Sequence, residues 1–232
     1  MTAGTIFHSS RYPLRTWFEV AWHVCEQKND VSALGLKRAL GFGSYHTALR
    51  WLHAMRKVMV MPGRNLLNGE VEVDETFVGG VKSCKRGRGA TGKVLVMVAA
   101  EVRGSAIGRI RLKVIPDATG FVLTGTVKEL VEMDSNGVTD GWAGYDGLAE
   151  AGYNHTISRH TPAVAKNLLP KVNRVASLLE RWIMGTHQGS VSKEMLASYL
   201  DKFVFRFNLR TAGSCGLLFQ RLLSQAVQPH GC

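Results

Sequence analysis

The hydrophobic positions of the first 65 residues recur at intervals of three and four, which is typical of amphipathic helices. This spacing predicts a helix from Pro13 to about Gln27, a short helix over 31–40 and a third helix over 45–59. Asp30 or Ser32 is placed to cap the second helix, and Ser44 to cap the third. The intervening Gly-Phe-Gly at 41–43 predicts a tight turn.

The third predicted helix carries a stripe of apolar residues that we expect to face a core: Ala48, Leu49, Leu52, Met55 and Met59. Two short helices joined by a glycine turn are typical of a helix-turn-helix, whose second helix reads DNA. The basic residues that we place off this stripe are Arg50, Arg56 and Lys57. Two interpretations remain open for them, contact with DNA or the solvated face of an ordinary helical hairpin.

From residue 70 onwards the helical period gives way to strands. Three strands in a meander are predicted over 71–78, 93–102 and 108–116, followed by a helix over 118–132, a short strand ending in Asp140 and a strand over 155–158. Further helices are predicted over 171–184, 192–209 and 216–227. This order is that of the ribonuclease H-like α/β fold. We therefore predict a helical, helix-turn-helix-like region at 1–65 and a ribonuclease H-like domain at 66–232.

The charge of the chain points to a polyanionic partner. The 232 residues carry a formal net charge of +11 and a pI near 9.8, which favours nucleic acid first and an acidic membrane surface second. The sequence has no apolar run long enough to cross a membrane and no signal-peptide layout at its start, so a cytoplasmic location is predicted. The four cysteines lie far apart, which argues against a metal ribbon or a disulfide framework.

Against this basic background, residues 69–80 (GEVEVDETFVGG) concentrate four carboxylates. Asp74 lies on the first predicted strand and Asp140 ends the fourth, and these strands are neighbours in a ribonuclease H-like sheet. Two converging carboxylates are suited to hold Mg²⁺, which prefers oxygen ligands; the alternative is that each aspartate merely forms a turn. On the helix after Pro170, Asn173 and Glu180 share one face at i and i+7.

A second group of basic residues lies in a glycine-rich segment at 79–93 and consists of Lys82, Lys85, Arg86, Arg88 and Lys93. Basic residues interleaved with glycine can follow a phosphate backbone closely, and such contacts give affinity without sequence specificity. The alternative interpretation is a solvated hairpin loop.

The chain resembles bacterial insertion-sequence transposases of the DDE type, in the subgroup with an Asp-Asp-Asn (or His or Glu)-Lys set. The matching segments, in the family's order, are TAGTIFH, PLRTWF, EVDETFVGG, VTDGWAGY, LLPKVNRVASLL, GTHQGSVS, YLDKFVFRFNLR and LFQRLLSQAV. The resemblance implies metal-dependent DNA cleavage and strand transfer, with Asp74, Asp140 and Asn173 as ligands of Mg²⁺ or Mn²⁺, as two ions. It also implies double-stranded DNA as the partner, both transposon ends and target, bound by a homo-oligomer at the nucleoid.

Two departures from the family pattern qualify this expectation. Glu180 stands where the family carries a lysine, and Lys202 stands where it carries a glutamate. In addition, the segment that resembles the family begins after the position of its usual N-terminal zinc ribbon, so we expect a truncated product. The alternative function is therefore a catalytically inactive DNA-binding remnant of such a transposase.

Overall fold

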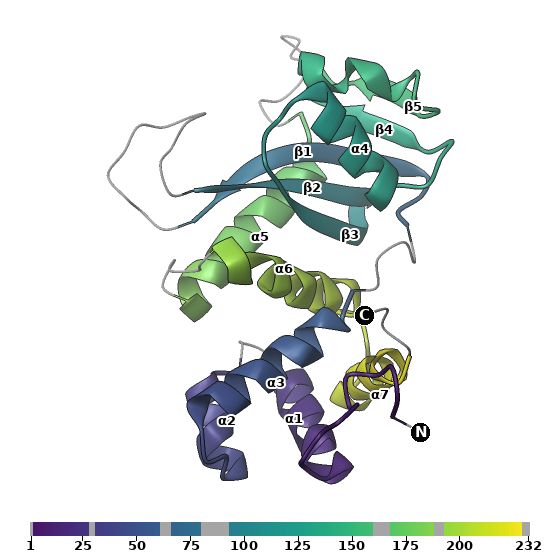
Figure 1. Cartoon of the computed structure of the whole chain (residues 1–232). Helices are drawn as coiled ribbons and strands as arrows, with labels where there is room; N and C mark the ends of the chain where they lie inside the picture. Colours follow the sequence, from purple (N-terminus) through teal and green to yellow (C-terminus); the bar gives the residue numbers. More distant parts are fainter. Residues whose placement is uncertain are drawn as a thin grey trace. The chain divides into compact units, whose positions relative to one another are not determined.

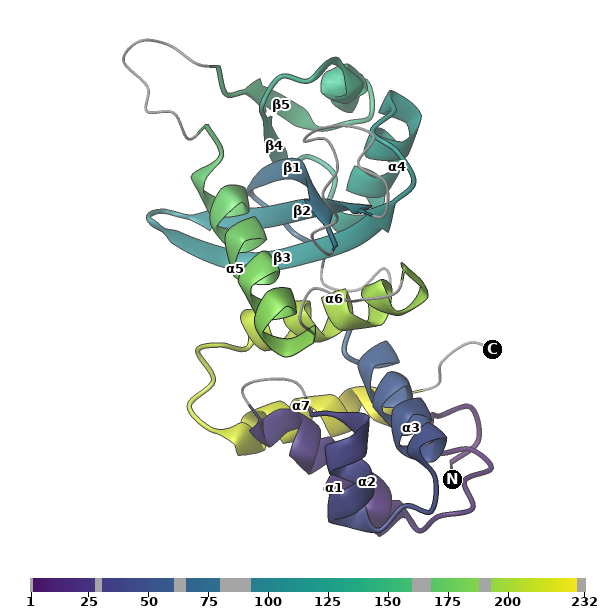
Figure 2. The ribbon, with the colours of Figure 1, turned by 90° about the vertical axis from the view of Figure 1, so that its left-hand side faces the viewer.

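The computed structural model describes residues 2–27, 31–60, 66–79, 93–159, 168–187 and 193–228. The chain forms two compact units (Figures 1 and 2). One unit comprises Met1–Met61 together with Asp201–Cys232, and the other comprises Pro62–Leu200.

The helical unit contains α1 (Leu14–Glu26), α2 (Ala33–Leu40), α3 (Tyr45–Lys57) and α7 (Cys215–Ala226). The Ser32 hydroxyl caps α2 by accepting a hydrogen bond from the Gly35 amide at 2.9 Å, and the Ser44 hydroxyl caps α3 by accepting one from the His46 amide. Gly41 ends α2 with a φ of 67°, a left-handed conformation that glycine adopts without strain. The two helices and the glycine turn that the sequence predicts are thus present.

The core of this unit combines residues from both ends of the chain. The Trp17 and Trp51 rings stack with centroids 3.7 Å apart, and the predicted α3 stripe is buried or partly buried beside them. Leu222 and Ala226 of α7 belong to the same core, and α7 packs on α1. The structure therefore groups 201–232 with the N-terminal helices, whereas the sequence-based boundaries placed this segment in the 66–232 domain.

The second unit is built on a five-stranded sheet with the order β3-β2-β1-β4-β5. Its strands are β1 (Glu70–Val78), β2 (Val94–Arg103), β3 (Ala106–Ile115), β4 (Asn136–Thr139) and β5 (Asn154–Ile157). The first three are antiparallel, whereas β4 and β5 run parallel to β1. This is the ribonuclease H-like order predicted from the sequence.

Helices cover both faces of this sheet, α4 (Gly120–Leu130) on one and α5 (Pro170–His187) on the other (Figures 1 and 2). Strand alternation sends Val71 and Val73 into the core beneath α4, where they join Leu123 and Val127. A 3₁₀ helix, η1 (Ala143–Leu148), follows β4, and α6 (Lys193–Asn208) follows α5. Among the described residues, no helix is long and apolar enough to span a membrane.

Candidate functional site

Asp74 lies on β1 and Asp140 directly follows β4, the two strands where the sheet changes from antiparallel to parallel. Residues 70, 71 and 72 of β1 pair with 136, 137 and 138 of β4. Residue 74 lies four positions after 70, and residue 140 lies four positions after 136. If the register continues, Asp140 therefore lies opposite Asp74. Because neighbouring strands lie roughly 4.8 Å apart, this register sets the two residues side by side, and the charge of Asp140 acts on Asp74. The predicted convergence of these strands is therefore observed.

The turn after β4 presents the Asp140 carboxylate to solvent. Thr139 is fully buried, and its hydroxyl bonds to the His155 ring at 2.8 Å. The carboxylate of Asp140 accepts the amide of Trp142 at 2.9 Å. Gly141 has a φ of 83°, and a Cβ there would lie 2.6 Å from the side chain of Ile157. Only glycine fits this turn, which fixes the direction in which Asp140 points.

The negative charge of Asp140 repels that of Asp74 on the neighbouring strand. Burial is the main reason that the pKa of Asp74 rises to about 6, and the charges of Glu75 and Asp140 raise it further. One opposing contact favours the ionised form, the Glu75 amide donating to Asp74 Oδ1 at 2.8 Å. A cation beside this pair would relieve the repulsion. Among the described residues, no three His, Cys, Asp or Glu side chains gather as a metal-binding group.

Glu75 points to the opposite face of β1, where it meets Tyr145. This tyrosine is fully buried in the core beneath α4. Burial first, and then the carboxylate of Glu75, raise the pKa of Tyr145 far above its ordinary value. The charges of Asp74 and Asp140 act on it in the same direction. The tyrosine hydroxyl is thus a neutral neighbour of the acidic pair.

The start of α5 is fixed to β1 by a buried acid that the sequence analysis did not single out. Glu72 is 6% exposed, and its carboxylate accepts the amides of Lys171 at 2.7 Å and Val172 at 3.0 Å. A carboxylate at a helix N-terminus satisfies unpaired amides and complements the helix dipole. Glu72 therefore places α5 next to the strand face that also carries Asp74.

This helix presents the third predicted site residue, Asn173, at its exposed surface. Asn173 and Ser177 line a hollow of about 430 Å³ together with Lys171, Arg174 and the β2–β3 turn. Glu180 lies further along α5 and is also exposed. Val172, Val175 and Leu179 are buried, as predicted from the helical spacing. Asn173 thus follows directly on the two amides that bind Glu72, whereas Glu180 lies two turns away.

The basic residues predicted to bind DNA differ in their exposure in the structure. Lys82, Lys85, Arg86 and Arg88 lie outside the described residues, whereas Lys93, Arg50 and Lys57 are exposed. The prediction for Arg56 is wrong because this side chain is only 3% exposed. Position 56 follows Leu52 by four residues and therefore lies on the core-facing side of α3. The prediction had placed Arg56 off the apolar stripe, although it directly follows Met55 of that stripe.

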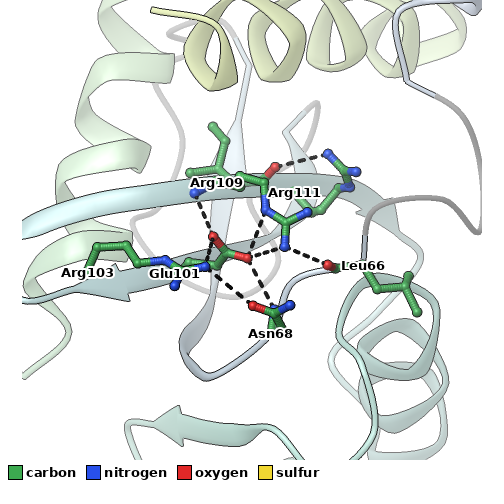
Figure 3. A network of polar contacts seen from close by, with 7 residues as sticks. Leu66, Asn68, Glu101, Arg103, Arg109 and Arg111 are labelled. Atoms are coloured by element: carbon green, nitrogen blue, oxygen red, sulfur yellow. Dashed lines mark hydrogen bonds and ion pairs between the residues drawn. The ribbon is translucent and has the colours of Figure 1, made fainter. Parts of the chain in front are cut away.

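A buried ion-pair network anchors the segment that leads into β1 (Figure 3). Glu101, 1% exposed, accepts hydrogen bonds from the backbone amide and the guanidinium of Arg109, and from the amide of Asn68 at 3.2 Å. Arg109 also donates to the carbonyl of Leu66 at 2.8 Å. The network ties residues 66–68 to the β2–β3 hairpin and so supports the strand that carries Asp74.

Comparison with known proteins gives a family match over most of the sheet-containing part of the chain. The model of the family described as ISXO2-like transposase domain matches residues 66–208. No match is found among the curated proteins.

Two solved structures show distant likeness. A chain of the Mos1 transposase paired-end complex with left transposon end is 12% identical with a TM-score of 0.36, and the likeness covers 95% of this chain and 81% of that one. A chain of a pre-cleavage Mos1 transpososome is 13% identical with a TM-score of 0.34, covering 97% and 80% respectively.

Proposed function

Because the chain belongs to the ISXO2-like transposase domain family, a family of insertion-sequence transposases of the DDE type, we propose that it cuts DNA at transposon ends and joins them to a target. DNA transposition is the function of this family. The observation that supports the catalytic proposal is the parallel pairing of β1 with β4, because Asp74 lies on β1 and Asp140 directly follows β4.

The acidic pair fits a divalent cation. Both side chains offer carboxylate oxygens, the ligands that Mg²⁺ and Mn²⁺ prefer, and burial together with the charges of Glu75 and Asp140 raises the pKa of Asp74 to about 6. Asp74 and Asp140 would hold the ions, with the Asn173 amide as a third, uncharged ligand. Bound divalent ions stabilise the charge that develops on a phosphodiester during hydroxyl attack.

The remaining residues position the pair and the DNA. Gly141 and Thr139 fix the direction of Asp140, while Glu72 places α5 beside Asp74. Lys171 and Arg174 line the hollow beside Asn173, where their charges would attract the phosphates of a bound strand. Exposed Arg50, Lys57 and Lys93 add further phosphate contacts, and we assign the same role to Lys82, Lys85, Arg86 and Arg88.

A second candidate function is that of a DNA-binding remnant without catalytic activity. Glu180, which is exposed on α5, motivates it, since a carboxylate at this position repels a phosphate that a lysine would attract. The two candidates differ in a single measurable respect, which is metal-dependent cleavage.

The test is nicking of a plasmid that carries the DNA flanking the gene, in the presence of Mg²⁺ or Mn²⁺. We expect Asp74→Asn and Asp140→Asn each to lower the nicking rate at least about 1000-fold, because each removes several kcal/mol of charge stabilisation. Glu70→Gln is the matched control, since Glu70 is an exposed carboxylate of the same strand. It should nick at the wild-type rate.

Activity that survives the combined Asp74→Asn and Asp140→Asn substitutions would overturn the catalytic assignment. A wild-type chain that binds DNA without nicking it, and that Glu180→Lys does not rescue, would instead establish the remnant. Rescue by Glu180→Lys would exclude the remnant and locate the defect at that position.

A further inference from the structure

The helical unit contains a hollow of about 660 Å³ that the acidic site does not use. One wall is the N-terminal arm, residues 9–12, and the other is the face of α3 formed by Thr47, Arg50 and Ala54. Trp17 and Trp51 form the floor. We call this the arm–α3 hollow. Its second wall belongs to the helix that a helix-turn-helix presents to DNA.

The arm is fixed against the helices by its own side chains. The Ser10 hydroxyl accepts a hydrogen bond from the indole of Trp17 at 2.8 Å and another from the amide of Tyr12 at 3.2 Å. The Tyr12 ring meets the rings of Trp51 and Phe42 edge to face, with centroids 5.2 and 5.5 Å apart. Three residues outside the arm, Trp17, Phe42 and Trp51, thus hold it in place, so the wall carrying Arg11 is formed before any ligand arrives.

The lining of the arm–α3 hollow is suited to an anion. Arg11 and Arg50 are exposed on its two walls, hydroxyls of Ser9 and Thr47 lie beside them, and its lining includes no acidic residue. The nearby Glu19 is engaged with Arg15. Guanidinium groups bind phosphate through paired N–H donors, and hydroxyls add neutral donors to the same oxygens. Two cations facing one hollow repel each other unless an anion lies between them.

The aromatic floor distinguishes a phosphate from a base. Base stacking needs an accessible ring face, but the Trp17 and Trp51 rings stack on each other at an interplanar angle of 8° and are 5% and 8% exposed. The hollow therefore offers charged and hydroxyl donors above an apolar floor that is already packed. This combination suits a sugar–phosphate backbone.

We propose that the arm–α3 hollow binds the phosphate backbone of duplex DNA, with Arg11 and Arg50 contacting phosphates from opposite walls. This inference rests on the proposed function for the identity of the partner. It adds a site formed jointly by the arm and α3, and it assigns a role to Arg11, which lies in no predicted DNA-binding segment. Because the contacts are to phosphate, they hold for DNA of any sequence.

The test uses the full chain and a random-sequence DNA duplex, with affinity measured across a range of salt concentrations. Each phosphate contact contributes about −0.9 to the slope of log K against log salt. We expect Arg11→Ala and Arg50→Ala each to reduce the slope by about 1, and the double variant by about 2. The control is the double variant Lys128→Ala/Arg221→Ala, which removes the same charge from exposed positions outside the hollow and should leave the slope near wild type.

A second variant tests the hollow separately from its charge. Ala54→Phe fills the space between the walls while keeping both arginines, and we expect it to reduce the slope as the double arginine variant does. Circular dichroism verifies that each variant is folded. A slope for Arg11→Ala/Arg50→Ala equal to that of the control pair, or wild-type binding by a folded Ala54→Phe variant, would overturn the inference.

The same measurements separate this inference from the proposed function. If the salt slope falls as expected in the arginine variants but the wild-type chain nicks no plasmid, DNA binding at the arm–α3 hollow would be supported and the catalytic proposal contradicted. If the wild-type chain nicks the plasmid but the arginine variants keep its salt slope, the catalytic proposal would be supported and DNA binding at the hollow contradicted. A wild-type chain that binds no duplex DNA would contradict both.

Discussion

Glu101 and Asp74 lie on adjacent strands of one sheet, and their surroundings shift the pKa values of the two carboxyls in opposite directions. Burial alone would raise the pKa of Glu101, but hydrogen bonds from Arg109 and Asn68 outweigh it and hold that pKa below its ordinary value. Burial raises the pKa of Asp74 to about 6, and the nearest charges are those of further acids. Glu101 is therefore held by several donors, whereas Asp74 accepts one backbone amide and faces other acids.

This difference separates a structural acid from a functional one. A carboxylate with a full set of donors stabilises the fold and has little left to offer a ligand. A carboxylate that faces another carboxylate destabilises the fold until a cation arrives, which is the usual cost of a binding site. The partners of each acid, more than its burial, indicate its role.

Removing the Glu101 carboxylate should have the largest effect on stability. Glu101→Ala leaves the Arg109 guanidinium, whose side chain is 34% exposed, without its partner and frees residues 66–68. We expect the free energy of unfolding at pH 7 to fall by about 3 kcal/mol, as measured by urea denaturation. Because the pKa of Glu101 is lowered in the folded state, its contribution is present above its unfolded pKa and is lost as pH falls. The cost should therefore shrink below about pH 4.

Glu70→Gln is the matched control for this experiment, because Glu70 is an exposed acid of the neighbouring strand. Its unfolding free energy should stay within about 0.5 kcal/mol of wild type. An equally small effect of Glu101→Ala would show that the network in Figure 3 is not structural.

Replacing Asp74 by a neutral residue should stabilise the metal-free protein. Asp74 has a folded pKa near 6, so its ionisation costs stability as pH rises through that value. We expect Asp74→Asn to raise the free energy of unfolding at pH 8 by about 2 kcal/mol, allowing for partial exposure. The gain should nearly vanish at pH 4. Thermal unfolding in EDTA at the two pH values measures this, and a gain independent of pH would contradict the origin that we assign to it.

The smallest of the three effects belongs to Glu72, which is satisfied by backbone amides alone. Glu72→Ala removes two hydrogen bonds at the N-terminus of α5, and we expect a loss of about 1–2 kcal/mol at pH 7. Hydrogen exchange of the first turn of α5 should increase, while exchange in β3 stays unchanged. Unaltered exchange at Lys171 and Val172 would mean that Glu72 does not hold the helix.

Much of the fold follows from local patterns in the sequence. The spacing of apolar residues predicts each α-helix and strand to within a few residues, but not the 3₁₀ helix η1, and the two serine caps on α2 and α3 form as expected. The order of the strands also predicts that Asp74 and Asp140 converge, because β1 and β4 are neighbours in this topology.

What the sequence does not predict depends on tertiary contacts. An amphipathic helix shows which face it buries but not its partner, so the packing of α7 on α1 was missed. Glu72 and Glu101 were missed because their partners lie 99 and 8 residues away, in Lys171 and Arg109. Arg109 lies on a strand in which basic and apolar residues alternate, and its guanidinium pairs with a buried carboxylate.

The central claim is that Asp74 and Asp140 form a site for a divalent cation, and direct titration with Mn²⁺ at pH 7.5 tests it best. Followed by electron paramagnetic resonance, the wild-type chain and Glu70→Gln should bind Mn²⁺ with equal affinity. Asp74→Asn/Asp140→Asn should bind at least about tenfold more weakly, the least that loss of direct ligands costs. Equal Mn²⁺ binding by the folded double variant and the wild type would contradict the claim.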